Sequence, residues 1–123
     1  MTPAVRELRT LPKAHLHLHL TGSARLATIQ ELADKYSISL PSALVDEEFD
    51  WGEGGRDWAY FQEQYAAARQ TIRSVCDVRR IIREAAEDDA AEGSGWLELQ
   101  VDPSSYARHL GGLEPAVEVL VDA

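Results

Sequence analysis

The sequence predicts an α/β fold, the N-terminal part of a (β/α)8 TIM-type barrel that is rich in helix and contains two parallel strands. Two segments, at about 14–20 and about 96–101, alternate between apolar and polar residues, and helical periodicities separate them. Strands that are joined by helical crossovers pair in parallel, and two strands alone do not form a stable sheet. Because a complete barrel needs about 250 residues, we expect residues 1–123 to form an incomplete barrel domain without the remaining strands.

The first predicted strand carries three histidines. Apolar and polar residues alternate over residues 14–20, which places His15, His17 and His19 on one side and three leucines on the other. A period of two indicates a strand, and we expect the leucines to face a packed layer. A glycine then ends the strand, and Ser23 is predicted to cap the helix that follows.

Three amphipathic helices are predicted between the two strands. Their apolar residues recur at spacings of three and four over residues 24–36, 58–72 and 77–92. The second helix carries an aromatic stripe, formed by Trp58, Phe61 and Tyr65. We interpret this stripe as part of the core rather than as a stacking surface for bases.

The remaining segments complete the order of elements. Residues 46–57 are acidic, contain three glycines and are predicted to form a surface loop. Asp77 is expected to cap the third helix. Alternation returns over residues 96–101, with apolar residues on one side, and a loop rich in Ser and Gly then leads to a final helix that begins near Leu113.

The chain is acidic and has a single cysteine. It carries 12 Lys and Arg against 21 Asp and Glu, for a formal net charge of -9. A polyphosphate backbone repels such a chain, so we expect no nucleic-acid partner. No apolar run approaches the ~20 residues that cross a bilayer, so no membrane partner is expected. Cys76 alone cannot form an internal disulfide or a cysteine-based zinc site, and these features together favour a cytoplasmic location.

His17 and His19 are the candidate metal ligands. Same-face neighbours on a strand lie about 6.5–7 Å apart, so two imidazoles can converge on one metal with bonds of about 2.0–2.1 Å. The pair lies where the strand meets the following loop, the end that builds the active site in a barrel. Two ligands do not complete a catalytic zinc site, so further ligands must come from another segment or chain. His109, in a loop, is not expected to be one.

Two sets of motifs resemble a known family. The first set is Leu11-Pro12-Lys13-Ala14, His17-Leu18-His19-Leu20 and Gly22-Ser23, and the second is residues 87–90, residues 96–100 and Pro103. The first set is similar to the N-terminal signature of the adenosine deaminase family of metal-dependent amidohydrolases, and the second is similar to that family's second strand. The resemblance spans about residues 11–106, and the histidine segment is its most specific part.

The resemblance implies a (β/α)8 barrel that uses one zinc ion to replace the exocyclic amine of a purine with oxygen, releasing ammonia. By position, His17 and His19 match the family's first two zinc ligands, and the residue matching His19 also contacts substrate. Thr21 matches an aspartate that holds the ribose of adenosine. The family's third zinc histidine and its later catalytic residues have no counterpart before Ala123. We therefore expect no catalytic residue in this chain, and no activity from the chain by itself.

Three positions depart from the family pattern. His15 stands where the family has an acid, and we interpret it as a buried hydrogen-bonding residue. Thr21 lacks the charge of the aspartate that it replaces, which leaves adenine or a modified nucleoside such as aminodeoxyfutalosine as alternatives to adenosine. Gln100 stands where an arginine is common. An alternative of a different class is a non-catalytic, truncated metal-binding or interaction protein that retains the histidine strand.

Overall fold

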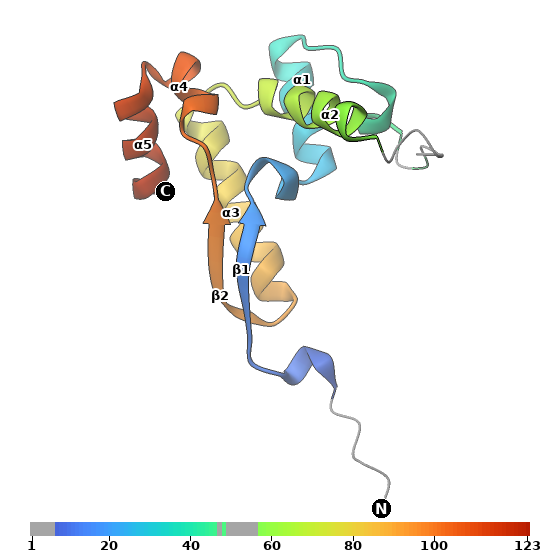
Figure 1. The fold of residues 1–123 in the computed structure, drawn as a ribbon, viewed down its shortest axis with the longest axis vertical. Helices are drawn as coiled ribbons and strands as arrows, with labels where there is room; N and C mark the ends of the chain where they lie inside the picture. Colours follow the sequence, from blue (N-terminus) through green and yellow to red (C-terminus); the bar gives the residue numbers. More distant parts are fainter. Residues whose placement is uncertain (1–6, 47, 49–56) are drawn as a thin grey trace, which may run out of the picture.

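The described chain forms a two-stranded parallel sheet with helices gathered around it. The computed structural model describes residues 7–46, 48 and 57–123, which Figure 1 shows as a ribbon. Strands β1 (Lys13–His19) and β2 (Ser94–Gln100) pair in parallel, as predicted. Between them lie α1 (Leu26–Tyr36), α2 (Trp58–Gln70) and α3 (Val75–Ala91), and after them come α4 (Ser104–Leu110) and α5 (Leu113–Asp122). Short 3-10 turns occur at η1 (Leu8–Thr10), η2 (Thr21–Ser23) and η3 (Ser42–Leu44).

The helices surround the carboxyl ends of the strands. Helix α3 runs alongside the sheet, α1 and α2 lie beyond the end of β1, and α4 and α5 lie beyond the end of β2 (Figure 1). The predicted loop over residues 46–57 lies mostly outside the described residues. The order strand, helices, strand, final helix is the one that the two periodicities predict, and α4 is an additional helix between β2 and α5.

Two helix starts differ from the sequence-based expectation. Ser74, not Asp77, is the N-cap of α3, and the two residues form a capping box in which each side chain accepts from the other's backbone N–H. Arg25 precedes α1, whereas the hydroxyl of Ser23 donates to the Leu20 carbonyl within η2 at 2.8 Å. Ser23 therefore closes the turn after β1, and the expectation that it caps α1 was wrong.

Helix α4 was predicted to be part of a loop. Pro103 is its N-cap residue, and Asp102 just before it accepts with Oδ1 from the backbone N–H and the hydroxyl of Ser104, at 3.0 and 2.7 Å. Gly111 ends it with a φ of 90°, a left-handed conformation that glycine adopts without steric cost. The helix has only seven residues, too few to produce a clear 3.6-residue period.

A β-bulge interrupts the alternation of β1. His15 pairs with Leu97 and Leu18 pairs with Leu99, so three steps along β1 oppose two steps along β2. One extra residue moves the following side chains to the other face. His15 and Leu18 consequently both face α3, and the Nδ1 atom of His15 lies 2.8 Å from Oδ1 of Asp89. The prediction that all three histidines share one side was wrong. His15 does have a hydrogen-bonding contact, but its side chain is 43% exposed, so the expectation that it is buried was wrong.

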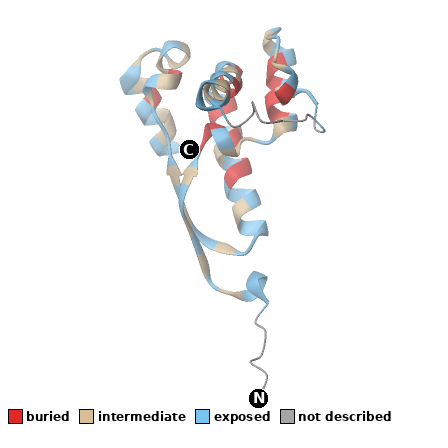
Figure 2. Ribbon diagram, turned by 45° about the vertical axis from the view of Figure 1, so that its right-hand side comes forward, coloured by how far each residue is buried: buried red, intermediate tan, exposed pale blue. Residues whose placement is uncertain are grey.

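The core lies at the carboxyl ends of the strands, where the helices meet. Its buried cluster consists of Leu20, Leu32, Ile72, Val78, Ile81 and Tyr106. Figure 2 shows buried segments on the helices, whereas the strands are exposed or half-buried. Leu16 is 59% exposed and Trp96 is 62% exposed. The expected packed layer thus covers Leu20 but not Leu16, and part of the sheet has no cover within the described residues.

Paired charges on α3 face α1, and one of them, Glu84, is buried. Arg80 bonds Glu84 at 2.8 Å, and Arg25 reaches across from the start of α1 to Asp88 at 2.7 Å. These contacts place part of the run of arginines and acids in salt bridges, both within α3 and between α3 and the start of α1. None of the helices in the described ranges combines the length and the apolar character that a bilayer span requires.

Candidate active site

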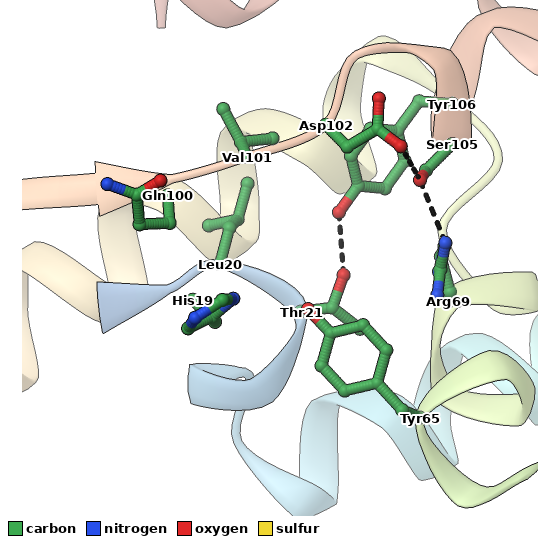
Figure 3. Close-up of a pocket in the computed structure, with 10 residues that line it drawn as sticks. All are labelled: His19, Leu20, Thr21, Tyr65, Arg69, Gln100, Val101, Asp102, Ser105 and Tyr106. Carbon is green, nitrogen blue, oxygen red and sulfur yellow. Dashed lines mark hydrogen bonds between the residues drawn. The ribbon is translucent and has the colours of Figure 1, made fainter. Parts of the chain in front are cut away.

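The carboxyl ends of the two strands lie side by side. His19 ends β1, Gln100 ends β2, and the two residues are register partners. The N–H of Leu20 donates to the Gln100 carbonyl at 3.0 Å, so the pairing continues beyond β1. A cavity of about 300 Å³ opens at this edge, shown in Figure 3. In parallel α/β folds, the segments that follow the strands at this edge carry the functional residues.

His17 and His19 point their imidazoles toward the same place. The two Nε2 atoms lie 3.1 Å apart, and the ring centroids are 4.9 Å apart at an interplanar angle of 62°. The register shift in β1 lies between His15 and Leu18, which share one face, so His17 and His19, the neighbours of Leu18, lie on the opposite face. Both residues are exposed in the described chain. The expected proximity of this pair is present, and its role as a ligand pair stays a prediction.

The separation of the two nitrogens fits a shared metal ion. With zinc–nitrogen bonds of about 2.0–2.1 Å, nitrogens 3.1 Å apart subtend about 100° at the metal, near the tetrahedral angle. The same separation also fits an N–H···N hydrogen bond between two neutral rings. No third His, Cys, Asp or Glu completes a metal-binding group within the described part of the chain. The pair can therefore supply two ligands of a site, not a whole one.

Thr21 lies in the wall of the cavity directly after the histidine strand. It is 5% exposed, and its Oγ1 atom lies 2.7 Å from the phenol oxygen of Tyr106, which is 2% exposed. Burial raises the pKa of the Tyr106 phenol, and the hydrogen bond to Thr21 opposes that rise. The predicted substrate-binding residue therefore has an internal partner. Its role toward substrate stays a prediction.

Polar residues from α2 and α4 form the opposite wall of this polar cavity. The Nη1 atom of Arg69 donates to the Ser105 hydroxyl at 2.9 Å, and that hydroxyl donates to Oδ2 of Asp102 at 3.2 Å. Hydrogen bonds from Ser104 hold the pKa of Asp102 below its usual range. Sequence analysis missed these residues. The position of Asp102 directly after β2 was a signal that could have identified it, whereas Arg69 carries no local signal.

A second cavity, of about 470 Å³, has an aromatic wall. Its described lining residues are His19, Gly22, Trp58, Phe61, Gln62 and Tyr65. Trp58 stacks on Phe61 with centroids 5.5 Å apart, and the two residues are 70% and 46% exposed. The interpretation of this stripe as core was wrong for these two rings. Because His19 and Tyr65 also line the polar cavity, the two cavities adjoin at these two residues.

The other candidate side chains lie away from these two cavities. His109 is in α4 and is absent from the described lining of both. Burial lowers its pKa, and the guanidinium groups of Arg108 and Arg73 lower it further. Cys76 is an exposed free thiol in the first turn of α3. Neither residue joins the histidine pair.

Similarity to known proteins agrees with this arrangement. The family model of adenosine deaminase matches residues 12–123, almost the whole chain. The chain belongs to the adenosine deaminase family. The match includes both strands, the histidine pair and the residues that line the polar cavity.

Several relatives in the adenosine deaminase family are named for deaminases. A Streptomyces virginiae protein with the provisional name adenosine/adenine deaminase is 56% identical over 120 residues, covering 96% of this chain and 35% of the relative. The aminodeoxyfutalosine deaminase of Streptomyces coelicolor is 37% identical over 102 residues, covering 80% of this chain and 25% of the relative. The chain thus spans about a third or less of the length of these relatives.

A solved structure supports the fold class. Arabidopsis ADAL complexed with IMP superposes with a TM-score of 0.68 at 26% identity, over 93% of this chain and 34% of that chain. This likeness confirms the predicted class, a helix-rich α/β fold that corresponds to part of a TIM barrel.

Proposed function

We propose that this chain is the N-terminal part of a zinc-dependent hydrolytic deaminase that acts on adenosine or a related adenine nucleoside. The observation that carries the proposal is the convergence of the His17 and His19 Nε2 atoms, 3.1 Å apart, together with the position of His19 in the walls of two adjoining cavities. The names of its family relatives support deamination. The remaining barrel strands would supply the further ligands and the groups that transfer protons.

The reaction exchanges one group on the purine ring. Water adds its oxygen to the carbon that bears the exocyclic amine, and the amine leaves as ammonia. Zinc in such a site acts as a Lewis acid and makes water a nucleophile near neutral pH. His17 and His19 would hold the ion through Nε2. Because His19 also lines both cavities, a substrate seated there would place its purine ring close to the ion.

The two cavities suit the two parts of a nucleoside. The aromatic wall offers stacked rings at Trp58 and Phe61, which favour a planar base. The polar cavity offers hydroxyl, carboxylate and guanidinium groups, which suit a hydroxylated sugar. Each cavity falls within the ~300–1,000 Å³ range of small-molecule sites. These features favour a nucleoside over a free base such as adenine.

Metal analysis and ammonia release test the proposal on the complete protein that contains this chain. We expect about one zinc per active site, and loss of both zinc and turnover in His17→Ala and His19→Ala. The loss of turnover should exceed about 100-fold, because even changes beyond the ligands cost 10–100-fold in such sites. His109→Ala is the matched control, since it removes an imidazole outside both cavities. Undiminished zinc content and turnover in either ligand variant would contradict the site.

Substrate choice is a separate measurement. Adenosine, adenine and aminodeoxyfutalosine are compared by kcat/KM with the same preparation. The 37% identity to aminodeoxyfutalosine deaminase makes that nucleoside the second candidate. Preference for adenine would contradict the assignment of the polar cavity to a sugar, while leaving the histidine site intact.

A further inference from the structure

Arg69 places a cationic group in the wall of the polar cavity. The residue comes from α2, and Figure 3 shows its side chain beside Ser105, across from Thr21. One N–H of the guanidinium donates to the Ser105 hydroxyl at 2.9 Å, and the group lies 5.1 Å from the centre of the Tyr65 ring. These two contacts hold the planar group in place at the cavity.

The guanidinium retains unused hydrogen-bonding capacity. It has five N–H donors, and Nε is buried without a hydrogen-bond partner among the described residues. Among the residues that the structure describes, no carboxylate oxygen lies within 4 Å of the Arg69 guanidinium, whereas Arg25 and Arg80 each have several. Its positive charge is therefore not neutralised by a direct ion pair.

The carboxylate that shares the cavity is already engaged. Oδ1 of Asp102 accepts from the backbone N–H and the hydroxyl of Ser104, and Oδ2 accepts from the Ser105 hydroxyl. Ser105 thus separates Asp102 from Arg69. The Asp102 carboxylate keeps its negative charge and interacts electrostatically with Arg69, but its oxygens are occupied by hydrogen bonds. The free N–H donors of Arg69 therefore favour a ligand group that is rich in acceptors, such as an anion.

We propose that Arg69 binds an anionic group, a phosphate or a carboxylate, on the sugar side of the adenine nucleoside that this protein deaminates. The inference rests on the proposed function, because it takes the aromatic cavity as the place of the base. A guanidinium binds such groups with two parallel hydrogen bonds. The chain has a net charge of -9, which repels anions at long range, so a cation inside the cavity is what selects them.

Kinetic ratios on the complete protein test this inference. The ratio is kcat/KM for the anionic substrate divided by kcat/KM for adenosine, with adenosine 5′-monophosphate and adenosine 5′-carboxylate as separate anionic probes. We expect at least one ratio to exceed about ten in the wild type. Arg69→Gln should lower that ratio at least tenfold, and the probe that responds identifies phosphate or carboxylate as the group.

Two further variants keep the test decisive. Arg69→Lys retains the stem and the charge but loses the paired donors, so the ratio should fall partway. Arg83→Gln removes one positive charge from the exposed face of α3, where the side chain is 68% exposed, and should leave the ratio unchanged. An equal fall for Arg83→Gln would assign the effect to net charge and overturn the inference.

The remaining outcomes separate the inference from the function on which it rests. Deamination of adenosine with a ratio below one, or a ratio that Arg69→Gln does not change, overturns the inference and leaves the deaminase intact. Absence of deamination with every purine tested contradicts the proposed function instead. In that case calorimetric titration with inosine and inosine 5′-monophosphate still tests Arg69, because tighter binding of the monophosphate should be lost in Arg69→Gln.

Discussion

The hydrogen bond between Thr21 and Tyr106 provides the sharpest test of how the cavity wall is built. Both residues are at least 95% buried and their hydroxyl oxygens lie 2.7 Å apart, joining η2 to α4. Thr21→Val keeps the shape and removes the hydroxyl, which leaves a buried phenol without its partner. Such a loss costs about 1–3 kcal/mol in the free energy of unfolding. Tyr106→Phe should lower the free energy of unfolding by a similar amount, because it leaves the buried hydroxyl of Thr21 without its partner.

The double variant separates the bond from the packing. When both hydroxyls are removed, no buried group is left unsatisfied, so the cost should be less than the sum of the single costs. The expected coupling energy is about 0.5–1.5 kcal/mol. Urea denaturation, followed by tryptophan fluorescence, gives the free energy of unfolding of the wild type, the two single variants and the double variant. Additive costs within about 0.3 kcal/mol would refute the bond as a stabilising contact.

Tyrosine titration supplies an independent readout of the same contact. Burial raises the pKa of Tyr106 and the hydrogen bond to Thr21 lowers it, so Thr21→Val should raise that pKa further. Thr21→Ser is the matched control because it retains the hydroxyl. A pKa that is equal in the wild type and Thr21→Val would contradict the observed geometry.

Two further predictions concern the stability of the fold around the site. Burial opposes ionisation of Asp77, yet hydrogen bonds from Lys35, from Tyr36 and from the backbone N–H groups of Arg73 and Ser74 hold its pKa at about 2, below the ordinary 3.8. Because the folded-state pKa is the lower one, this contribution, about 2 kcal/mol, is fully present above pH 3.8 and is lost as the pH falls toward 2. The difference in unfolding free energy between the wild type and Asp77→Asn should therefore shrink as the pH falls from 3.8 toward 2. Asp34→Asn, at an exposed position of α1, is the control and should differ little from the wild type. A difference for Asp77→Asn that stays constant with pH would contradict the linkage. Gly93→Ala should destabilise by about 1–2 kcal/mol or more, because Gly93 has a φ of 86° and an added Cβ would lie 2.8 Å from the Arg9 carbonyl oxygen. Gly95→Ala is its control, since nothing lies within 4 Å of the added atom, and equal costs in urea denaturation would exclude the clash as the cause.

The alternation of apolar and polar residues predicted the faces of the side chains correctly in β2 but not in β1. In β2 the alternation predicted from the sequence is present, with Leu97 and Leu99 less exposed than their neighbours. In β1 the same reasoning placed His15 on the side of His17 and His19. The bulge arises from pairing with β2, a segment far along the chain. The alternation within β1 therefore cannot predict a register shift that depends on its pairing with β2.

Some residues of the candidate site could likewise be predicted from the sequence, and others could not. Spacing within a single strand was enough to select His17 and His19, because two residues on one strand keep their separation in any fold that contains the strand. The rest of the cavity depends on helix packing. Trp58 has the spacing of a core residue, yet it is 70% exposed beside a cavity, because α2 turns only its Ala68 and Gln64 side into the interior.

The class of fold, the order of the strands and long helices, and the pair of histidines at the end of β1 could all be predicted from the amino-acid sequence. These features follow from local periodicity, which nearby residues impose on one another. That Arg69, Asp102 and Tyr106 share a cavity with His19 could be seen only once the helices were placed around the strands. Helices α2 and α4 reach this edge because they bury apolar surface against a common core, and such packing depends on shape rather than on sequence spacing.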